Sequence, residues 1–575
     1  MTRGAETKQQ TARRFAGRSA LVLAFFALAA TSLLARAVHL QVLNKDFLNR
    51  QADSRHLRTE KISAHRGTIT DRNGEPLAIS TPVDSIWANP KELASAIDKV
   101  PKLAKILGLD SQTLMRRITR SMEREFLYLK RHLSPKTAQA VLALKLPGVN
   151  VQREYRRYYP AGEVTGHLIG FTNIDDAGQE GLELAFNHWL AGESGLKRVL
   201  KDRLGRSVEN VESIQPARHG KELRASIDLR IQYVAYRTLK AAVQAHNAES
   251  GSIVVLDVRT GEVLAIVNQP TYNPNDRSQY SAERYRNRAI TDIFEPGSSM
   301  KPLIVAAALE SGDYRPSSIV DTAPGYVVVD AKRIEDPRNL GRISLTTILA
   351  RSSNVGVTKL AMSLQPEQLW QTMTKFGLGS LTASGFPGES AGLLTHYSHW
   401  QPISQATLAY GYGVSVTPLQ LAQAFAALGS DGRMHPISLI AVEQAGDGEQ
   451  VLAATTAIAV RRMLEEVVRP GGTGTKAAVA GYRVAGKTGT AWKFAAGGYS
   501  EHKYISIFAG LAPASSPRLA VIVVIDEPSG ELYYGSDVAA PVFADVMAES
   551  LRLLAVPPDA LPARDPGGIL QAMSR

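Results

Sequence analysis

The chain has 575 residues, of which 44% are hydrophobic and 21% charged, so its composition is that of a globular protein and excludes extensive disorder. It contains no cysteine, which excludes thiol nucleophiles, disulfides, iron–sulfur clusters and cysteine-ligated zinc. The net charge of +12 suits an anionic membrane, an anionic polymer or a nucleic acid. Any nucleophile must therefore be oxygen or nitrogen, and this length predicts several domains.

The N-terminus has the pattern of a membrane anchor. Residues 1–18 carry five basic side chains and one acidic one, and the uncharged run 19–35 follows directly. A helix over 19–40 is long enough to cross a bilayer, and the positive charge ahead of it predicts a cytoplasmic tail at 1–18. The bulk of the chain is then expected on the periplasmic side of a bacterial inner membrane. A cleaved signal peptide is the alternative, since residues 35–37 loosely fit a cleavage site.

A first domain outside the membrane is expected over 41–221. It includes a predicted hairpin over 67–79, because two short strand patterns flank the Asn73-Gly74 turn, and a predicted helix over 90–107. Charged helical stretches alternate here with glycine-rich segments, which predicts an elongated α+β scaffold.

A second domain is expected over 222–555. Four apolar runs of strand length lie in it: 253–257, 262–268, 504–511 and 519–525. Strand patterns at both ends, with helical patterns between them, predict one α/β domain. The tail 556–575 contains four prolines and is predicted to be mobile.

Ser298 is the first candidate for a chemical role. It follows a turn and precedes a strongly apolar helix pattern, and Lys301 shares its helix face. A partly desolvated lysine in that position can take the serine proton. The same spacing occurs at Ser194 and Ser500 without that context, and a helix-capping serine is the simpler interpretation of this motif alone.

Ser352-Ser353-Asn354 is a second candidate, lying after a helix pattern at 345–350. A hydroxyl and an amide two residues apart in a turn can both point into a cleft. One can then relay a proton while the other binds a substrate amide. A polar helix end is the alternative interpretation.

The segment Lys487-Thr488-Gly489-Thr490 is a third candidate. An amine and two hydroxyls on a strand suit the binding of a carboxylate. Gly489 has no side chain, so another backbone can approach the strand edge, and an extended peptide can add there as a strand.

Other motifs compete with these three. Residues 481–488 also fit the phosphate-binding loop of nucleotide hydrolases, but no buried strand is predicted before them and no helix after them. Ser390 lies in the Gly-x-Ser-x-Gly pattern of α/β-hydrolases, with loop patterns on both sides. His396 and His399 lack the metalloprotease spacing and are interpreted as loop residues rather than metal ligands.

The three candidate motifs, in this order, resemble the active-site set of the penicillin-binding protein and serine β-lactamase superfamily. Residues 66–74, 157–160 and 178–183 look like the pedestal motifs of class B penicillin-binding proteins. Residues 386–389 and 406–418 look most like the division-specific, septal branch. No glycosyltransferase block is found between the anchor and the second domain, so a bifunctional polymerase is not expected.

The resemblance implies a septal peptidoglycan D,D-transpeptidase whose C-terminal domain has an antiparallel sheet flanked by helices. Ser298 is then expected to attack the D-Ala-D-Ala carbonyl, with Lys301 as base, Ser352 as proton relay and Asn354 on the substrate amide. Residues expected to bind the carboxylate of the substrate or of a β-lactam are Lys487, Thr488, Gly489 and Thr490. The N–H groups of Ser298 and Thr490 are expected to form the oxyanion hole. No metal or cofactor is implied.

The implied partners are peptidoglycan stem peptides, β-lactams bound covalently at Ser298, the inner membrane, and a multi-span lipid-linked glycan polymerase with other division proteins. Nucleic-acid binding is not expected, because the basic residues are spread along the chain rather than interleaved with aromatic ones. The alternatives are an elongation-type transpeptidase, a penicillin-binding scaffold or sensor without turnover, and a β-lactamase.

Overall fold

The computed structural model describes residues 4–43, 45, 57–201, 207–276, 278, 281–495 and 498–560. The chain forms two compact units that alternate along the sequence. The first unit comprises Met1–Ala64, Val83–Glu154 and Glu193–Arg218; the second comprises His65–Pro82, Tyr155–Gly192 and His219–Arg575. The second unit therefore includes segments from well before residue 222, where the sequence predicts that the second domain begins.

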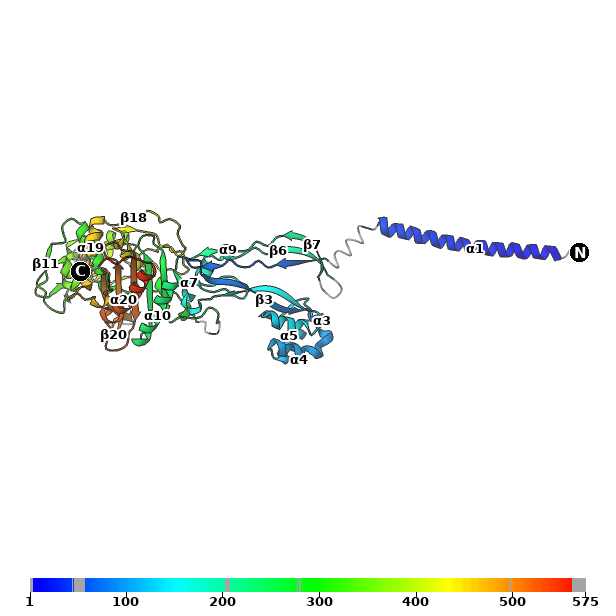
Figure 1. The fold of residues 1–575 in the computed structure, drawn as a ribbon, viewed down its shortest axis with the longest axis horizontal. Coiled ribbons are helices and arrows are strands. Elements are labelled where there is room, and N and C mark those ends of the chain that lie inside the picture. The colour runs from blue at the N-terminus through cyan, green and yellow to red at the C-terminus, as the bar shows by residue number, and fades with distance from the viewer. Residues whose placement is uncertain are drawn as a thin grey trace, which may run out of the picture. The chain divides into compact units, whose positions relative to one another are not determined.

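The first unit begins with a long helix, α1 (Gly4–Val38), which continues into a π-helical turn at His39–Leu43. Figure 1 shows α1 as one uninterrupted helix. Within Gly17–Val42 the most apolar stretch buries none of its residues, so by length and composition this helix is able to cross a membrane. The predicted anchor at 19–40 lies inside this range.

The rest of the first unit has a three-stranded antiparallel sheet and a small helical cluster. The sheet has the order β1-β6-β7: β1 (Leu57–Ile62), β6 (Gly195–Lys201) and β7 (Ser207–Gln215). The cluster consists of α3 (Pro90–Leu93), a 3-10 turn at Ala94–Lys99, α4 (Val100–Leu107), α5 (Ser111–Arg120), β4 (Leu127–Leu133) and α6 (Pro135–Leu142). Its apolar core includes Leu103, Ile118 and Val141.

The single helix predicted over 90–107 is wrong, because the structure divides it into α3, the 3-10 turn and α4. Ala96 leaves the helical conformation, with φ −128° and ψ 34°. Pro101 lacks an N–H group, so a helix accepts it best in the first turn, where α4 places it.

A five-stranded antiparallel sheet forms the centre of the second unit. Its order is β10-β9-β21-β20-β19: β10 (Val263–Gln269), β9 (Ser250–Asp257), β21 (Leu519–Asp526), β20 (Gly498–Ala512) and β19 (Ala485–Ala495). Ile253 and Val255 belong to one hydrophobic core, while Val254 and Leu256 belong to another, as the alternation of a strand requires. Both faces of the sheet are therefore covered.

Helices supply those covers. On one face lie α10 (Leu229–Ala245) and α20 (Gly535–Leu553), and on the other lies α18 (Pro418–Gly429), while α19 (Ala454–Val468) packs against β19. Asp228 begins α10 by accepting a hydrogen bond from Arg230 N at 3.0 Å. The predicted fold class, an α/β domain with an antiparallel sheet flanked by helices, is confirmed.

Shorter elements complete the second unit. The helices are α7 (Gly166–Ile169), α8 (Gly181–Ala185), α9 (Asn187–Leu190), α11 (Ala282–Tyr285), α12 (Arg288–Thr291), α13 (Lys301–Glu310), α14 (Leu345–Ala350), α15 (Asn354–Ser363), α16 (Pro366–Lys375) and α17 (Pro402–Leu408). The 3-10 turns lie at Gly162–Val164, Gly297–Met300, Tyr397–His399 and Thr475–Ala477. Two-stranded ribbons pair β11 (Ile319–Asp321) with β14 (Arg342–Ser344), β12 (Tyr326–Val329) with β13 (Lys332–Glu335), β15 (Leu393–Leu394) with β16 (Val414–Ser415), and β17 (Arg433–Met434) with β18 (Glu449–Gln450).

The hairpin predicted around Asn73-Gly74 is confirmed. It joins β2 (Ile69–Thr70) to β3 (Pro76–Ala88), and β2 also pairs with β8 (Leu223–Arg224). The strand β5 (Val149–Tyr158) pairs with β3. Asp71 closes the turn by accepting hydrogen bonds from Asn73 N at 2.7 Å and Glu75 N at 2.9 Å.

The three segments that look like pedestal motifs meet at one buried carboxylate in the second unit. Glu183 pairs with Arg66 Nε at 2.5 Å and with Arg157 Nε at 2.6 Å, and all three side chains are buried. Removing either arginine leaves a buried charge without part of its compensation, which is strongly destabilising. These motifs therefore hold distant segments of the second unit together.

The chain after α20 is bound to the second unit as far as Ala560. Tyr482 Oη donates to Val556 O at 2.6 Å, and Asp559 accepts from Arg483 N at 2.7 Å and Ser515 N at 3.1 Å. The prediction of a mobile tail from Val556 is therefore wrong for its first five residues, because backbone N–H groups of the unit find their acceptors there. The remainder of that tail lies outside the described residues.

Candidate active site

Ser298 lies in the 3-10 turn Gly297–Met300, directly before α13. Gly297 has φ +53°, a left-handed conformation that suits glycine, and it begins the turn. The Ser298 side chain is half-buried and forms no hydrogen bond with any described residue. Lys301 follows on α13 and is fully buried, so a half-exposed hydroxyl and a buried amine lie three residues apart in the chain.

The Lys301 amine is held by the Ser352-Ser353-Asn354 motif. Its Nζ donates to Ser352 O at 2.6 Å, to Ser352 Oγ at 3.1 Å and to Asn354 Oδ1 at 2.6 Å. Three oxygen atoms of this motif thus surround the Lys301 nitrogen and fix its position. The first two candidate motifs therefore meet, although 51 residues separate Lys301 from Ser352.

The third motif reaches the same hydroxyl. Lys487 Nζ donates to Ser352 Oγ at 3.0 Å and to Thr488 O at 3.0 Å. Ser352 Oγ therefore lies between two lysine nitrogens, which are within about 6 Å of each other. Like charges at that separation oppose each other, so simultaneous protonation of both amines is disfavoured.

Burial changes the proton affinity of both lysines. Burial lowers the pKa of Lys487 to about 7. Burial also lowers the pKa of Lys301 well below its usual value, and the nearby Lys487 lowers it further, while the Asp336 carboxylate opposes the shift. The lowered pKa of Lys301 makes its amine easier to deprotonate and so better suited to act as a base.

Asp336 positions the second motif and was not found from the sequence. It accepts hydrogen bonds from Ser353 Oγ at 2.5 Å, Asn354 N at 2.6 Å and Val355 N at 3.1 Å. Ser352 itself has φ +56°, an uncommon conformation for a residue other than glycine. No sequence pattern marks Asp336, because its partners become neighbours through the ribbon β12–β13 and α15.

The edge strand β19 carries the third motif past the Ser298 turn. A Cβ at Gly297 would lie 3.3 Å from Ala491 Cβ and from Thr490 O, so the turn and the strand are in contact. On an edge strand, alternate N–H groups point away from the neighbouring strand. The two N–H groups predicted for the oxyanion hole, those of Ser298 and Thr490, thus belong to adjoining segments.

A pocket of about 270 Å³ opens beside Ser298. Its lining residues are Ser298, Asn354, Thr490, Tyr410, Tyr412, Trp492, Tyr504, Tyr533 and Tyr534. The sequence candidates Ser298, Asn354 and Thr490 line it, whereas Lys487 and Thr488 are buried behind it. The aromatic lining residues, which we call the aromatic wall, were mostly not predicted from the sequence, because tyrosines scattered over 410–534 form no motif.

Thr488 and Thr490 have partners that the sequence did not indicate. Thr488 Oγ1 shares a hydrogen bond with Thr473 Oγ1 at 3.0 Å, and Thr490 Oγ1 accepts from Gly535 N at 3.0 Å. Gly489 lies where a Cβ would come within 3.1 Å of Pro296 O, so this glycine allows close approach of the segment before Ser298.

The competing motifs have the wrong surroundings. Lys487 and Thr488 lie inside strand β19 rather than at the start of a helix, so they cannot form a phosphate-binding loop. Ser390 accepts a hydrogen bond from Gly392 N in a loop without the strand and helix of a hydrolase elbow. Among the described residues no group of three or more His, Cys, Asp or Glu is arranged to hold a metal ion.

Comparisons with known proteins agree with this geometry. Residues 251–548 match the penicillin binding protein transpeptidase domain, and residues 61–225 match the penicillin-binding protein dimerisation domain. The chain is 44% identical over 569 residues to the peptidoglycan D,D-transpeptidase FtsI of Escherichia coli, covering 98% of this chain and 96% of that protein. It is 42% identical to the probable peptidoglycan D,D-transpeptidase PbpC of Pseudomonas aeruginosa, covering 95% and 96%.

Solved structures show the same relationship. The transpeptidase domain of penicillin-binding protein 3 from Burkholderia pseudomallei is 43% identical, with a TM-score of 0.55, and covers 59% of this chain and 98% of that one. A peptidoglycan synthetase from Bifidobacterium adolescentis is 26% identical, with a TM-score of 0.70, over 88% of this chain and 98% of that one. With its motifs, its fold and these relatives, the chain belongs to the class B penicillin-binding proteins, in the branch of the septal peptidoglycan D,D-transpeptidases.

Proposed function

We propose that this chain cross-links the stem peptides of septal peptidoglycan by acyl transfer through Ser298. The observation that carries the proposal is the convergence of Lys301 Nζ and Lys487 Nζ on Ser352 Oγ, next to the pocket that Ser298 lines. A hydroxyl nucleophile, a neutral amine and a relay hydroxyl are the groups that serine acyl transfer requires.

In the acylation step, Ser298 Oγ forms a bond to the carbonyl carbon of the penultimate D-alanine. Its proton goes to the neutral amine of Lys301, whose depressed pKa makes it a base. The C–N bond to the terminal D-alanine then breaks. Ser352 passes its hydroxyl proton to the leaving amine and takes in return the proton that Lys301 received from Ser298. The N–H groups of Ser298 and Thr490 stabilise the oxyanion, at about 2.7–4 kcal/mol for each donor.

Substrate binding falls to the residues around the pocket. Asn354 holds the substrate amide, and the carboxylate of the terminal D-alanine is bound by Thr490 at the pocket wall. Lys487 and Thr488, with Gly489 between the two threonines, support it from behind, because the charge of Lys487 attracts the carboxylate.

The second half of the reaction uses another stem peptide. Its amine attacks the acyl-enzyme carbonyl, the Ser298 ester bond breaks, and a cross-link forms while Ser298 regains its proton. The aromatic wall, which includes Trp492 and Tyr534, limits the access of water. A β-lactam presents a similar carbonyl and carboxylate, so it acylates Ser298 and stays bound.

The anchor and the first part of the chain place this chemistry at the septum. The basic residues ahead of the uncharged run 19–35 hold the N-terminus at 1–18 in the cytoplasm, and residues 41–555 then lie in the periplasm. Residues 41–221 serve as the pedestal and 222–555 as the transpeptidase domain. The partner at the anchor and pedestal is a multi-span lipid-linked glycan polymerase, together with other division proteins.

Labelling with penicillin tests the assignment of Ser298. The full-length chain in detergent is incubated with a labelled penicillin, and the modified peptide is mapped by mass spectrometry. We expect the label on Ser298 in the wild-type chain and none in Ser298→Ala, since the remaining groups cannot form the ester.

The outcomes separate the alternatives. A label that persists in Ser298→Ala, or that maps near Ser390, contradicts the assignment. Rapid release of the label by water indicates a β-lactamase, and stable labelling without cross-linking of peptidoglycan indicates a binding scaffold.

A further inference from the structure

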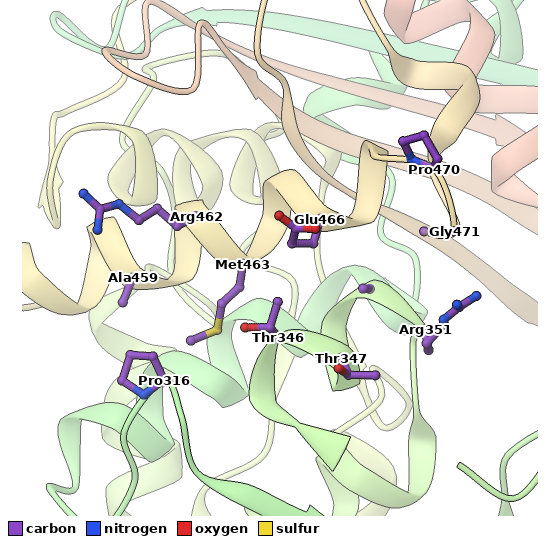
Figure 2. A pocket seen from close by; sticks show the side chains of 12 residues that line it. Pro316, Thr346, Thr347, Arg351, Ala459, Arg462, Met463, Glu466, Pro470 and Gly471 are labelled. Carbon is purple, nitrogen blue, oxygen red and sulfur yellow. The ribbon is translucent and has the colours of Figure 1, made fainter. Parts of the chain in front are cut away.

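A second pocket, of about 540 Å³, lies between α14 and α19 (Figure 2). One face of α19 lines it with Ala459, Arg462, Met463 and Glu466, at the spacing of a single helix face. Thr346, Arg351 and the segment 470–472 complete much of the lining. Its volume is in the range of small-molecule sites, and the mechanism above makes no use of it.

Among the described residues, the two arginines of this pocket have no carboxylate partner, whereas its one glutamate is paired. Arg351 and Arg462 form no ion pair with any carboxylate in the described parts of the chain. Glu466 pairs with Arg469, the residue directly after α19. The pocket therefore presents two guanidinium groups without counter-ions and one carboxylate that is already paired, which suits an anionic ligand.

The two arginines lie at separate ends of the pocket. Figure 2 shows Arg462 at one end and Arg351 at the other, with Met463 and Thr346 between them. Arg351 Nη2 would lie 3.6 Å from a Cβ at Gly471, beyond the end of α19. A compact ion would contact only one of the two guanidinium groups. A ligand that contacts both must be elongated and must carry two separated carboxylates.

Two lining residues of the pocket are next in the chain to residues of the catalytic site or in contact with it. Arg351 precedes Ser352 in the chain, and Gly472 precedes Thr473, whose N donates to Ala350 O at 3.2 Å and whose hydroxyl contacts Thr488. A ligand that holds Arg351 and the segment 470–472 therefore acts on segments that position the second and third motifs.

We infer that this pocket binds a short peptide with separated carboxylates and a free amine, which is the chemical class of an uncross-linked stem peptide. The carboxylates pair with Arg351 and Arg462, the amine shares the Glu466 carboxylate with Arg469, and Met463 contacts the aliphatic part between them. This inference rests on the proposed function, because the ligand is a part of the same polymer.

Calorimetry with N-acetyl-L-Ala-γ-D-Glu-diaminopimelate tests the inference. This tripeptide has the carboxylates and the amine but no D-Ala-D-Ala end, so it cannot acylate Ser298. The full-length chain is first acylated with penicillin, which blocks the catalytic pocket and separately tests the proposed function. We expect the tripeptide to bind the acylated chain, and Arg351→Gln or Arg462→Gln to weaken binding at least about tenfold.

Matched controls keep the result interpretable. Arg342→Gln removes an exposed arginine outside the pocket and is expected to leave the affinity unchanged. Penicillin labelling of each variant shows that it is folded. N-acetyl-Ala-Gln-Lys amide keeps the amine but has no carboxylate. Absence of binding to the acylated chain, binding of this amide with equal affinity, or equal binding by the Arg462→Gln chain would each overturn the inference.

Discussion

Lys301 and Lys487 both donate to the Ser352 hydroxyl and both are buried, yet the proposed reaction requires one of them to be neutral and the other to be charged. Lys301 must be neutral to accept the serine proton, and Lys487 must be charged to attract a carboxylate. Their surroundings favour this division, because Lys487 lowers the proton affinity of Lys301 and like charges this close repel each other. The single net charge of the pair is thus expected on Lys487.

The rate of acylation should therefore fall both when the pH is raised and when it is lowered. As the pH rises above about 7, Lys487 loses its charge and acylation by a penicillin carboxylate should slow. As the pH falls through the lower pKa of Lys301, the base becomes protonated and acylation should slow again. The measurement is the second-order rate constant for labelling by penicillin as a function of pH.

Lys487→Arg provides the matched variant, because arginine keeps its charge at every pH of the experiment. Its overall rate is expected to be lower, since a larger side chain must fit a buried position. The decline above pH 7 should nevertheless disappear. A decline that persists unchanged in this variant contradicts the role of Lys487.

Among the elements, the 3-10 turn Gly297–Met300 depends on the segment that follows α17. Gly297 N donates to Gly411 O at 3.1 Å, and a Cβ at Gly411 would lie 2.0 Å from Gly297 O. The backbone of the nucleophile turn and the backbone near Gly411 are therefore in direct contact, which no side chain permits. The position of Ser298 follows from this contact as much as from its own helix.

Gly411→Ala is expected to slow penicillin acylation by about tenfold to a hundredfold. The new methyl group must displace the Gly297 carbonyl, and a shift of about 1 Å at a catalytic group costs that much. Gly312→Ala is the control, because Gly312 has a similar φ of +82° but nothing within 4 Å of its Cβ. It should lower the free energy of unfolding by about 1–2 kcal/mol and leave acylation unchanged. Equal acylation rates in the two variants would contradict the steric argument.

For the whole molecule, the interleaving of two compact units is the main departure from a linear arrangement of domains. The first unit has its own core around Leu103 and Ile118, while the cores of the second unit include Ile69 and Leu168 from segments before residue 222. Distant parts of the chain therefore stabilise the unit that holds the catalytic motifs.

Protease protection tests the orientation of the whole chain. An epitope is fused ahead of Met1, and spheroplasts are treated with protease from outside. We expect digestion of the bulk of the chain and survival of a tagged fragment, because the basic residues ahead of the uncharged run 19–35 keep the N-terminus inside. Permeabilised cells should lose the tag. Loss of the tag in intact spheroplasts contradicts the proposed topology. Absence of the tag from the untreated protein indicates cleavage of a signal peptide and contradicts it as well.

Local patterns were sufficient for several elements and for the three candidate motifs. The helix at 345–350, the hairpin around Asn73-Gly74 and the buried strands of the central sheet follow from periodicity and turn chemistry, which act over a few residues. The three motifs were found because each is short and contiguous. The break at Ala96 was missed, although Pro101 in the first turn of α4 is a local signal for a new helix start.

The roles of neighbours became visible through tertiary contacts. Asp336, the aromatic residues at 410–534 and the burial of Lys487 behind Ser352 involve groups that are distant in the chain. Residue types and spacing carry the identity of chemical groups, so they indicated serine acyl transfer. Proton affinity and access depend on burial and on charges brought together by folding, and these set which lysine is neutral and where the pocket opens.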